Sequence, residues 1–198
     1  MTSTSRTTMR YAWQTPLVIV VCGCLIAMLG FGPRSSLGLF LTPMSSAHGW
    51  GREVFALALA IQMLLWGAAQ PFVGAIADRF GPVTVLCVGA VFYAAGLAWM
   101  ANAATPATLY LSGGVLIGFG LAGSSFTVVI GAFGKLLPAK WRSLSFGLGT
   151  AAGSFGQFLF APVAVGLNSV FPWHVTLMIF GAIVLAVMPL AFALSVPR

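Results

Sequence analysis

The sequence predicts an all-α membrane protein with six transmembrane helices. Its 198 residues are 60% hydrophobic and only 6% charged, with a mean hydropathy of +1.03. A soluble domain carries about 25% charged residues, so this composition indicates that lipid is the solvent of the outer surface. Six apolar runs are each long enough for a membrane-spanning helix, which needs about 20 residues. Basic residues lie in the short gaps between the runs, where topology signals are found.

Each helix is predicted where an apolar run lies between gaps: 16–41, 52–77, 83–100, 107–133, 143–167 and 173–194. The gaps hold Pro, Gly or charged residues, which end membrane helices: 42–51, 78–82, 102–106, 135–142 and 168–172. Residues 16–194 are therefore expected to form one bundle. Residues 1–15 precede it as an N-terminal tail, and residues 195–198 begin a loop or a second tail.

The distribution of Lys and Arg predicts the orientation of the bundle. One side has Arg52 alone, and Arg34 falls inside the first helix. The other side has seven basic residues: Arg6, Arg10, Arg79, Lys135, Lys140, Arg142 and Arg198. Because basic residues stay on the cytoplasmic side, we expect both termini in the cytoplasm of a multi-pass protein of the cell (inner) membrane. This placement explains the positive charge without nucleic acid as a partner.

Small residues recur at a spacing of four in the fourth and fifth predicted helices. Such stripes let helix backbones approach closely in lipid. One stripe is predicted in the fourth helix: Gly114, Gly118 and Ala122. The other is predicted in the fifth helix and is expected to continue to a polar side chain: Ser145, Gly149, Gly153 and Gln157.

The turn after the second predicted helix carries Gly74, Asp78, Arg79 and Gly81, followed by Pro82. This spacing, G-x-x-x-D-R-x-G-P, resembles the cytoplasmic loop between helices 2 and 3 of the major facilitator superfamily. The resemblance implies the N-terminal half of a twelve-helix transporter fold, built as two three-helix inverted repeats. It also implies a gating role for the motif, with the charge of Asp78 acting on a partner in the second half.

Three further segments resemble the monocarboxylate porter and oxalate/formate exchanger group. Pro33-Arg34-Ser35 lies in the first helix, and residues 49–53 lead into the second. The third segment leads into and along the fifth helix: Arg142, Leu144, Gly147, Gly156 and Pro162. The resemblance implies a secondary active transporter for small organic anions such as monocarboxylates or dicarboxylates.

Arg34 is the main candidate for binding the substrate. An arginine within a membrane is costly and normally faces a wet cavity or a partner. The two acidic residues, Glu53 and Asp78, lie at the ends of the second helix, so an anionic substrate is a suitable partner for the guanidinium fork. The alternative is that Arg34 extends towards the outer surface or binds backbone carbonyls.

Four other polar side chains inside predicted helices are candidates for substrate contacts: Gln62, Gln157, Ser124 and Ser125. The alternative for each is a hydrogen bond between helices. His48 and His174 lie at outer helix ends without a nearby carboxylate, so the sequence predicts no metal site and implies no cofactor. A membrane enzyme is disfavoured, because neither G-x-S-x-G nor H-E-x-x-H occurs.

The length leaves a second class of function open. A twelve-helix transporter holds its substrate between two six-helix halves, and this sequence ends where a central cytoplasmic loop would start. We therefore expect a truncated product or fragment more than a half-transporter that dimerises. A non-transporting six-helix membrane protein is the other alternative. The expected partners are the lipid bilayer, a small organic anion and a second six-helix half.

Overall fold

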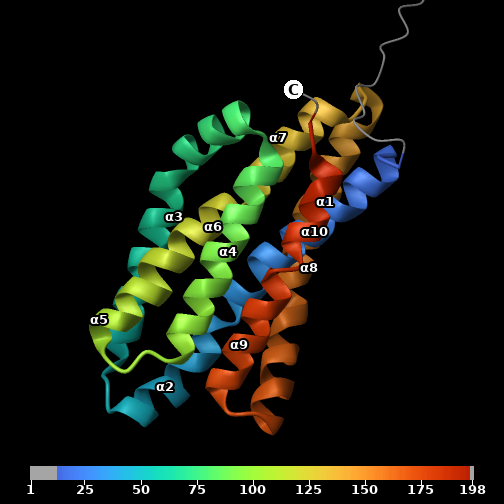
Figure 1. Cartoon of the computed structure of the whole chain (residues 1–198). Coiled ribbons are helices and arrows are strands. Elements are labelled where there is room, and N and C mark those ends of the chain that lie inside the picture. The colour runs from blue at the N-terminus through green and yellow to red at the C-terminus, as the bar shows by residue number, and fades with distance from the viewer. Residues whose placement is uncertain (1–12, 197–198) are drawn as a thin grey trace, which may run out of the picture.

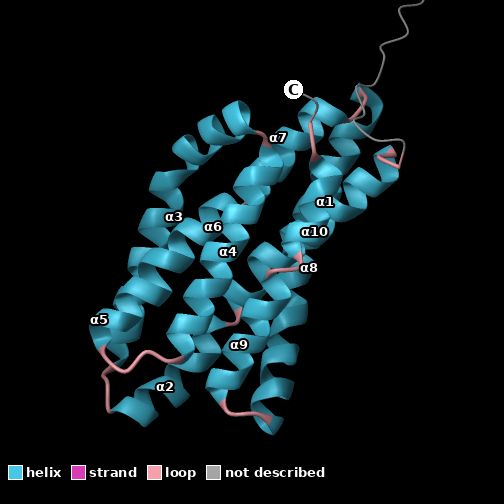
Figure 2. Cartoon of the chain, in the orientation of Figure 1, coloured by secondary structure: helices cyan, strands magenta, loops and turns pink. Residues whose placement is uncertain are grey.

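Six helical spans long and apolar enough to cross a membrane make up the bundle in Figure 1, a computed structural model that describes residues 13–196. Helices account for almost all of these residues, and the connecting loops are short (Figure 2). The predicted all-α fold with six spans is confirmed. Arg6, Arg10 and Arg198, which entered the prediction of topology, lie outside the described residues.

Three of the spans are single helices: α3 (Arg52–Phe80), α4 (Pro82–Ala101) and α8 (Ala139–Val170). The first span is divided into α1 (Pro16–Ser35), η1 (Leu37–Phe40) and α2 (Leu41–His48). The fourth is divided into α5 (Pro106–Leu109), η2 (Tyr110–Leu116), α6 (Ile117–Gly123) and α7 (Phe126–Leu136). The sixth is divided into α9 (Trp173–Val184), α10 (Val187–Ala191) and η3 (Phe192–Leu194).

The predicted end of the first span was wrong. Pro43 does not end the helix, because it lies in the first turn of α2, where its missing N–H is tolerated. The span continues to His48 and ends at Gly49, whose φ of 67° is a left-handed conformation that glycine adopts without strain.

The prediction of one continuous fourth helix was also wrong. Ser124 has a ψ of 22° and Ser125 a ψ of 152°, so the chain leaves helical geometry between α6 and α7. Ser124 donates both its backbone N–H and its hydroxyl to the carbonyl of Gly120, at 2.9 and 2.7 Å. This local bonding closes α6 and leaves α7 to start again near the middle of the span.

The pairing of the spans fits two inverted three-helix repeats. The most extensive pairing is that of α1 with α8, in the first and fifth spans. Another extensive pairing is that of α3 with η2 and α6, in the second and fourth spans. An inverted repeat that exchanges spans one and four and spans two and five converts one of these pairs into the other.

Small residues bring the backbones of the paired spans close together, as the predicted stripes require. Gly118 lies against Gln62 of α3, and Gly156 lies against the backbone of Met28 in α1. The predicted continuation of the α8 stripe at Gln157 was wrong. The buried face continues at Gly156 and Gln157 is exposed, because 3.6 residues per turn make i+3 as close to the stripe as i+4.

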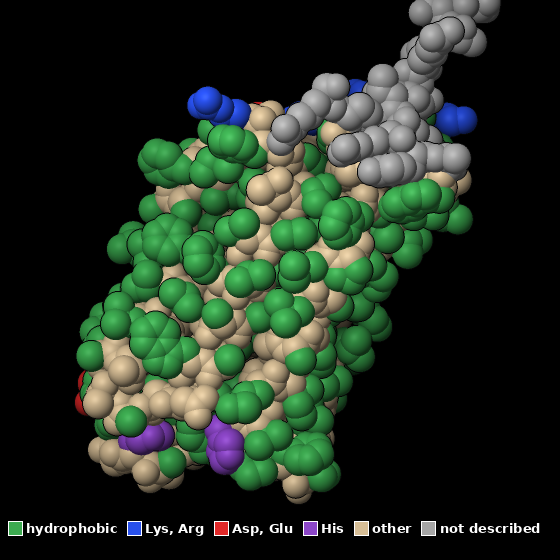
Figure 3. Space-filling model, in the orientation of Figure 1, with side chains coloured by type: hydrophobic (Ala, Val, Ile, Leu, Met, Phe, Trp, Pro, Cys, Tyr) green, Lys and Arg blue, Asp and Glu red, His purple; other side chains and the backbone are tan. Residues whose placement is uncertain are grey.

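Apolar side chains cover the sides of the bundle, and charges gather at its ends (Figure 3). Leu64, Phe72 and Phe158 are each more than two-thirds exposed, which suits contact with lipid. At one end, the buried side chain of Gln14 donates to the hydroxyl of Ser195 at 2.9 Å and to its carbonyl at 3.1 Å. The entry to α1 and the end of η3 are therefore tied together at the same end of the bundle.

A close approach of two backbones yields a test of the packing. A Cβ at Gly89 of α4 would collide with the backbone of Gly123 and Ser124, and backbone atoms cannot move aside cheaply. We expect Gly89→Ala to destabilise the protein by about 1–3 kcal/mol. Gly166→Ala in α8 is the matched control, because its Cβ meets open space and it should stabilise by a few tenths to about 1 kcal/mol. Thermal unfolding in detergent measures both, and equal melting temperatures would contradict this packing.

Candidate functional site

Arg34 brings a guanidinium into the interior of the bundle. It lies in the last turn of α1, and its side chain is half-buried. The guanidinium carbon lies 4.8 Å from the ring centroid of Trp66. Trp66 stands midway along α3 (Arg52–Phe80), so the guanidinium lies level with the middle of the bundle. This position argues against the alternative in which Arg34 extends to the outer surface.

The contacts of the guanidinium are weak ones. Its Nη2 donates to the sulfur of Met63 at 2.7 Å, and a thioether is a poor acceptor. Its face lies over Trp66, a cation–π contact. Nε of Arg34 is buried and makes no hydrogen bond within the described residues. The one ion pair in the described part of the chain lies elsewhere, so no carboxylate neutralises Arg34 there.

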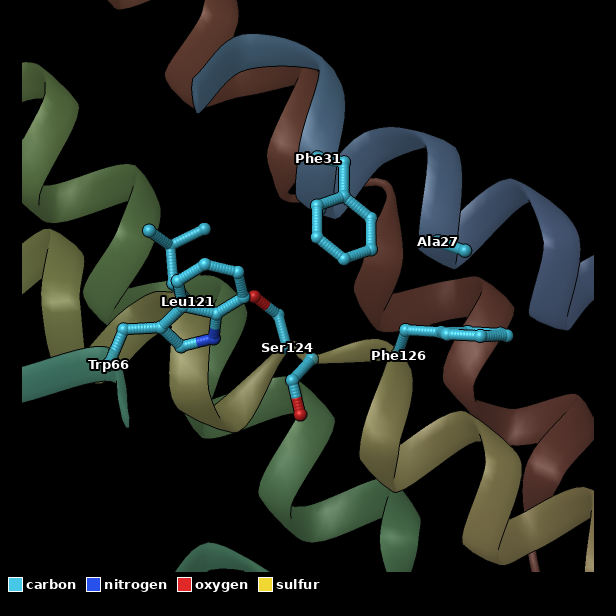
Figure 4. Close-up of a pocket in the computed structure, with 8 residues that line it drawn as sticks. Ala27, Phe31, Trp66, Leu121, Ser124 and Phe126 are labelled. Carbon is cyan, nitrogen blue, oxygen red and sulfur yellow. The ribbon is translucent and has the colours of Figure 1, made fainter. Parts of the chain in front are cut away.

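A small cavity of about 10 Å³ lies beside Trp66, where α1, α3 and the break between α6 and α7 meet. In Figure 4, Trp66 and Ser124 lie on one side of this space, and Phe31 and Phe126 lie on the other. Its volume is that of about one water molecule. Its lining is apolar apart from Trp66, Ser124 and Ser125.

Two polar candidates are already engaged in packing. Gln62 is buried in α3 and donates its amide to the carbonyl of Gly113 at 2.8 Å, across to the π-helical turn η2. Ser124 is buried and bonded to Gly120. These contacts fit the alternative in which each side chain makes a structural hydrogen bond.

The remaining two candidates differ in position. Ser125 lines the cavity and donates to Oε1 of Gln70 at 3.5 Å. Gln157 is exposed on α8, and its backbone carbonyl accepts from Ser35 at 3.4 Å. The structure therefore brings Ser125 close to Trp66 and leaves the side chain of Gln157 facing outward.

The predicted gating motif lies at the C-terminal end of α3. This is the end of the bundle at which most of the basic residues lie. Asp78 forms an ion pair with Lys135 of α7, with Nζ and Oδ1 2.6 Å apart. Asp78 therefore already has a charge partner within this half, and its expected contact with a second half stays a prediction. Arg79 lies over the ring of Phe80 at 5.5 Å. Gly81, with φ 91°, makes the turn into α4.

A groove with a volume of about 210 Å³ runs beside this ion pair, between α3 and α7. Gly74 of the motif lines it and so does Gly131 of α7. A Cβ at either glycine would meet open space, so neither is needed for the packing of this chain on itself.

The fifth-span motif is divided between two roles. Gly156 packs on α1, and Arg142 donates through Nε to the carbonyl of Leu137 at 3.0 Å, which holds the loop before α8. Leu144 is exposed and Gly147 faces open space. Pro162 lies within α8.

Sequence reasoning missed four residues of these sites: Met63, Trp66, Gln70 and Lys135. Two of them share a spacing signal with the motif, because Trp66 and Gln70 continue the i, i+4 series of Gly74 and Asp78 along one face of α3. Lys135 gave no signal of its own, since its partner depends on how α7 lies against α3.

Comparisons with known proteins agree with this architecture. Residues 13–198 match the profile of the Major Facilitator Superfamily. Human monocarboxylate transporter 11 is 31% identical over 176 residues, which cover 87% of this chain and 36% of that protein. YcxA of Bacillus subtilis (strain 168), an uncharacterized MFS-type transporter, is 28% identical over 190 residues, covering 92% and 44%. The chain thus spans about two fifths of the length of these relatives.

A profile match over almost the whole chain establishes the family, and the six membrane spans and the motif after α3 agree with it. The chain is therefore a multi-pass membrane protein that belongs to the Major Facilitator Superfamily, a family of transporters that carry small solutes across membranes and are not enzymes.

Proposed function

We propose that this chain forms the N-terminal six-helix half of a secondary active transporter for small organic anions such as monocarboxylates or dicarboxylates. One observation carries the proposal: the guanidinium of Arg34 lies level with the middle of α3, and its contacts there are a thioether and an aromatic face.

The free energy of burying Arg34 supports an anionic ligand. Arginine at the centre of a membrane helix costs about 2.5–3.5 kcal/mol on insertion scales. A thioether offsets little of this, whereas a carboxylate forms two charge-assisted hydrogen bonds with a guanidinium. Six matched relatives from human, mouse, rat and cattle are named monocarboxylate transporter 11, 13 or 3, which supports the same substrate class.

A second six-helix half is part of the proposal. The spans α3 and α8 are the least buried in this chain. Their exposed glycines, Gly67 and Gly147, face open space, although glycine weakens a helix by about 1 kcal/mol relative to alanine. Close approach by helices of another half would explain their presence. A second copy of this chain is the alternative occupant of these faces.

We further propose that the end of the bundle with the ion pair faces the cytoplasm of a cell whose inner membrane holds the protein. Arg79, Lys135, Lys140 and Arg142 lie towards this end, while Arg52 lies at the other. This asymmetry supports the orientation through the positive-inside rule.

Cysteine labelling tests the orientation. The three free cysteines (Cys22, Cys24 and Cys87) are first replaced, and single cysteines are introduced as Lys140→Cys and Asn102→Cys. A membrane-impermeant maleimide should label position 102 in intact cells and position 140 only after lysis. Labelling of position 140 from outside would refute the orientation.

Substitution of Arg34 tests the function. Losing a charge-assisted contact should cost about 2–3 kcal/mol, so Arg34→Gln should weaken binding of a carboxylate such as pyruvate about 30- to 150-fold. Arg34→Lys keeps the charge but loses the fork geometry, so its affinity should lie between those of the wild type and Arg34→Gln. Binding and proteoliposome uptake are measured beside the amount of folded protein. Wild-type affinity in Arg34→Gln would end the proposal.

The ion pair yields a test of gating. Both of its side chains are more than a third exposed, so its contribution to stability should not exceed about 1 kcal/mol. If its role is gating, Asp78→Asn and Lys135→Met, made in a protein that has both six-helix halves, should each impair transport several-fold while the protein inserts normally. The exchange of charges, Asp78→Lys with Lys135→Asp, should restore part of the rate. Lys140→Met is the control and should transport normally; equal rates in all variants would contradict a gating role.

A further inference from the structure

We propose that Trp66 is a substrate-binding residue whose indole N–H donates a hydrogen bond to the carboxylate that Arg34 holds, and that Met63 occupies the place of this carboxylate while the site is empty. The inference rests on the proposed function, because it requires an anion at Arg34.

Two residues of α1 fix the position of the Trp66 ring. Arg34 lies over its face at 4.8 Å, and Phe31 meets it edge to face, with centroids 6.0 Å apart and planes at 71°. Phe31 and Arg34 are three residues apart and therefore share one face of the helix. A ring held in this way presents its N–H in a fixed direction, as a binding group should.

The indole N–H has no acceptor. Nε1 of Trp66 is buried and makes no hydrogen bond within residues 13–196. Tryptophan N–H groups usually find a partner when they are buried, and a buried donor without one is costly. Nε of Arg34 is in the same condition. Two neighbouring unpaired donors on α1 and α3 would both be satisfied by one anionic acceptor.

The surroundings of Trp66 favour an acceptor with negative charge. The cavity beside it is also lined by Ser125 and Phe126, where α7 begins. The N-terminus of a helix carries partial positive charge, and here the side chain of Ser125 does not cap it. The two acidic residues of the chain lie at the far ends of α3. The donors therefore meet without a carboxylate of the protein to compete for them.

Met63 has the properties of a group that a substrate displaces. Its sulfur accepts from Nη2 of Arg34 at 2.7 Å, but a carboxylate oxygen is a much stronger acceptor. The side chain is about half exposed and unbranched, so it has room and freedom to move away. In the empty state it shields the guanidinium, and its replacement by a carboxylate strengthens the contact.

The test compares two variants that change one group each. Trp66→Phe keeps an aromatic face for Arg34 but removes the N–H. It should raise the KM for pyruvate uptake into proteoliposomes about 10- to 100-fold, with kcat and the amount of folded protein unchanged. Met63→Leu removes the competing acceptor at similar volume, so it should lower KM about two- to fivefold. Trp99→Phe, at an exposed tryptophan of α4, is the matched control and should leave KM unchanged.

A second replacement guards against misfolding of Trp66→Phe. Incorporation of 3-benzothienylalanine at position 66 keeps the shape of tryptophan and puts sulfur in place of the N–H, so it should raise KM to the same extent. Wild-type KM in either Trp66 variant would overturn the assignment of Trp66, and a raised KM in Met63→Leu would overturn that of Met63. If Arg34→Gln itself keeps wild-type affinity, the proposed anion site fails. If Arg34→Gln weakens binding but the Trp66 variants keep the wild-type KM, the anion site stands without Trp66.

Discussion

Backbone hydrogen bonding in a medium without water is the constraint on which this structure depends. Every N–H and C=O that faces lipid must be bonded within its own helix, so the chain crosses as helices, and irregular backbone is tolerated only where protein or a cavity surrounds it. The break at Ser124 and Ser125 obeys this rule, because both residues are buried and line the cavity beside Trp66. The carbonyl of Ser124 lies next to Gly30 of α1, just before α1 ends. The break in the fourth span thus lies against the second half of α1.

The meeting of α1, α3 and the start of α7 around Trp66 explains why the site is rich in hydrogen-bond donors and has no negatively charged acceptor. Helix α1 ends just beyond Arg34, and α7 starts just after Ser125 with its first N–H groups directed back into the bundle. Arg34 supplies positive charge, and the start of α7 supplies N–H groups. Trp66 adds another N–H from α3, and the acceptors nearby, among them the thioether of Met63, carry no negative charge. An interior built in this way has an electrostatic preference for anions before any particular substrate is considered.

The sequence was sufficient for the features that depend on composition and on local spacing. The six spans follow from apolar length, the turn at Gly81 follows from its motif, and Arg34 stands out as a charge inside an apolar run. What failed depends on tertiary contacts. The break at Ser124 lies where α4 approaches through Gly89, and the partner of Asp78 is known only once α7 is placed. Small and polar residues mark such places in the sequence without saying whether they bend, pack or bind.

The helices α3 and α7 connect the two ends of the proposed mechanism. Along one face of α3, Trp66 borders the cavity, Gln70 contacts Ser125 and Asp78 pairs with Lys135. Helix α7 begins at the cavity and ends at the ion pair. The groove of about 210 Å³ between α3 and α7 is not filled by side chains of either helix. A rigid-body shift of α7 against α3 would therefore change the surroundings of Trp66 and the geometry of the ion pair together. Helices that pack loosely and share contacts at both ends are suited to transmit occupancy of the cavity to the charged end of the bundle.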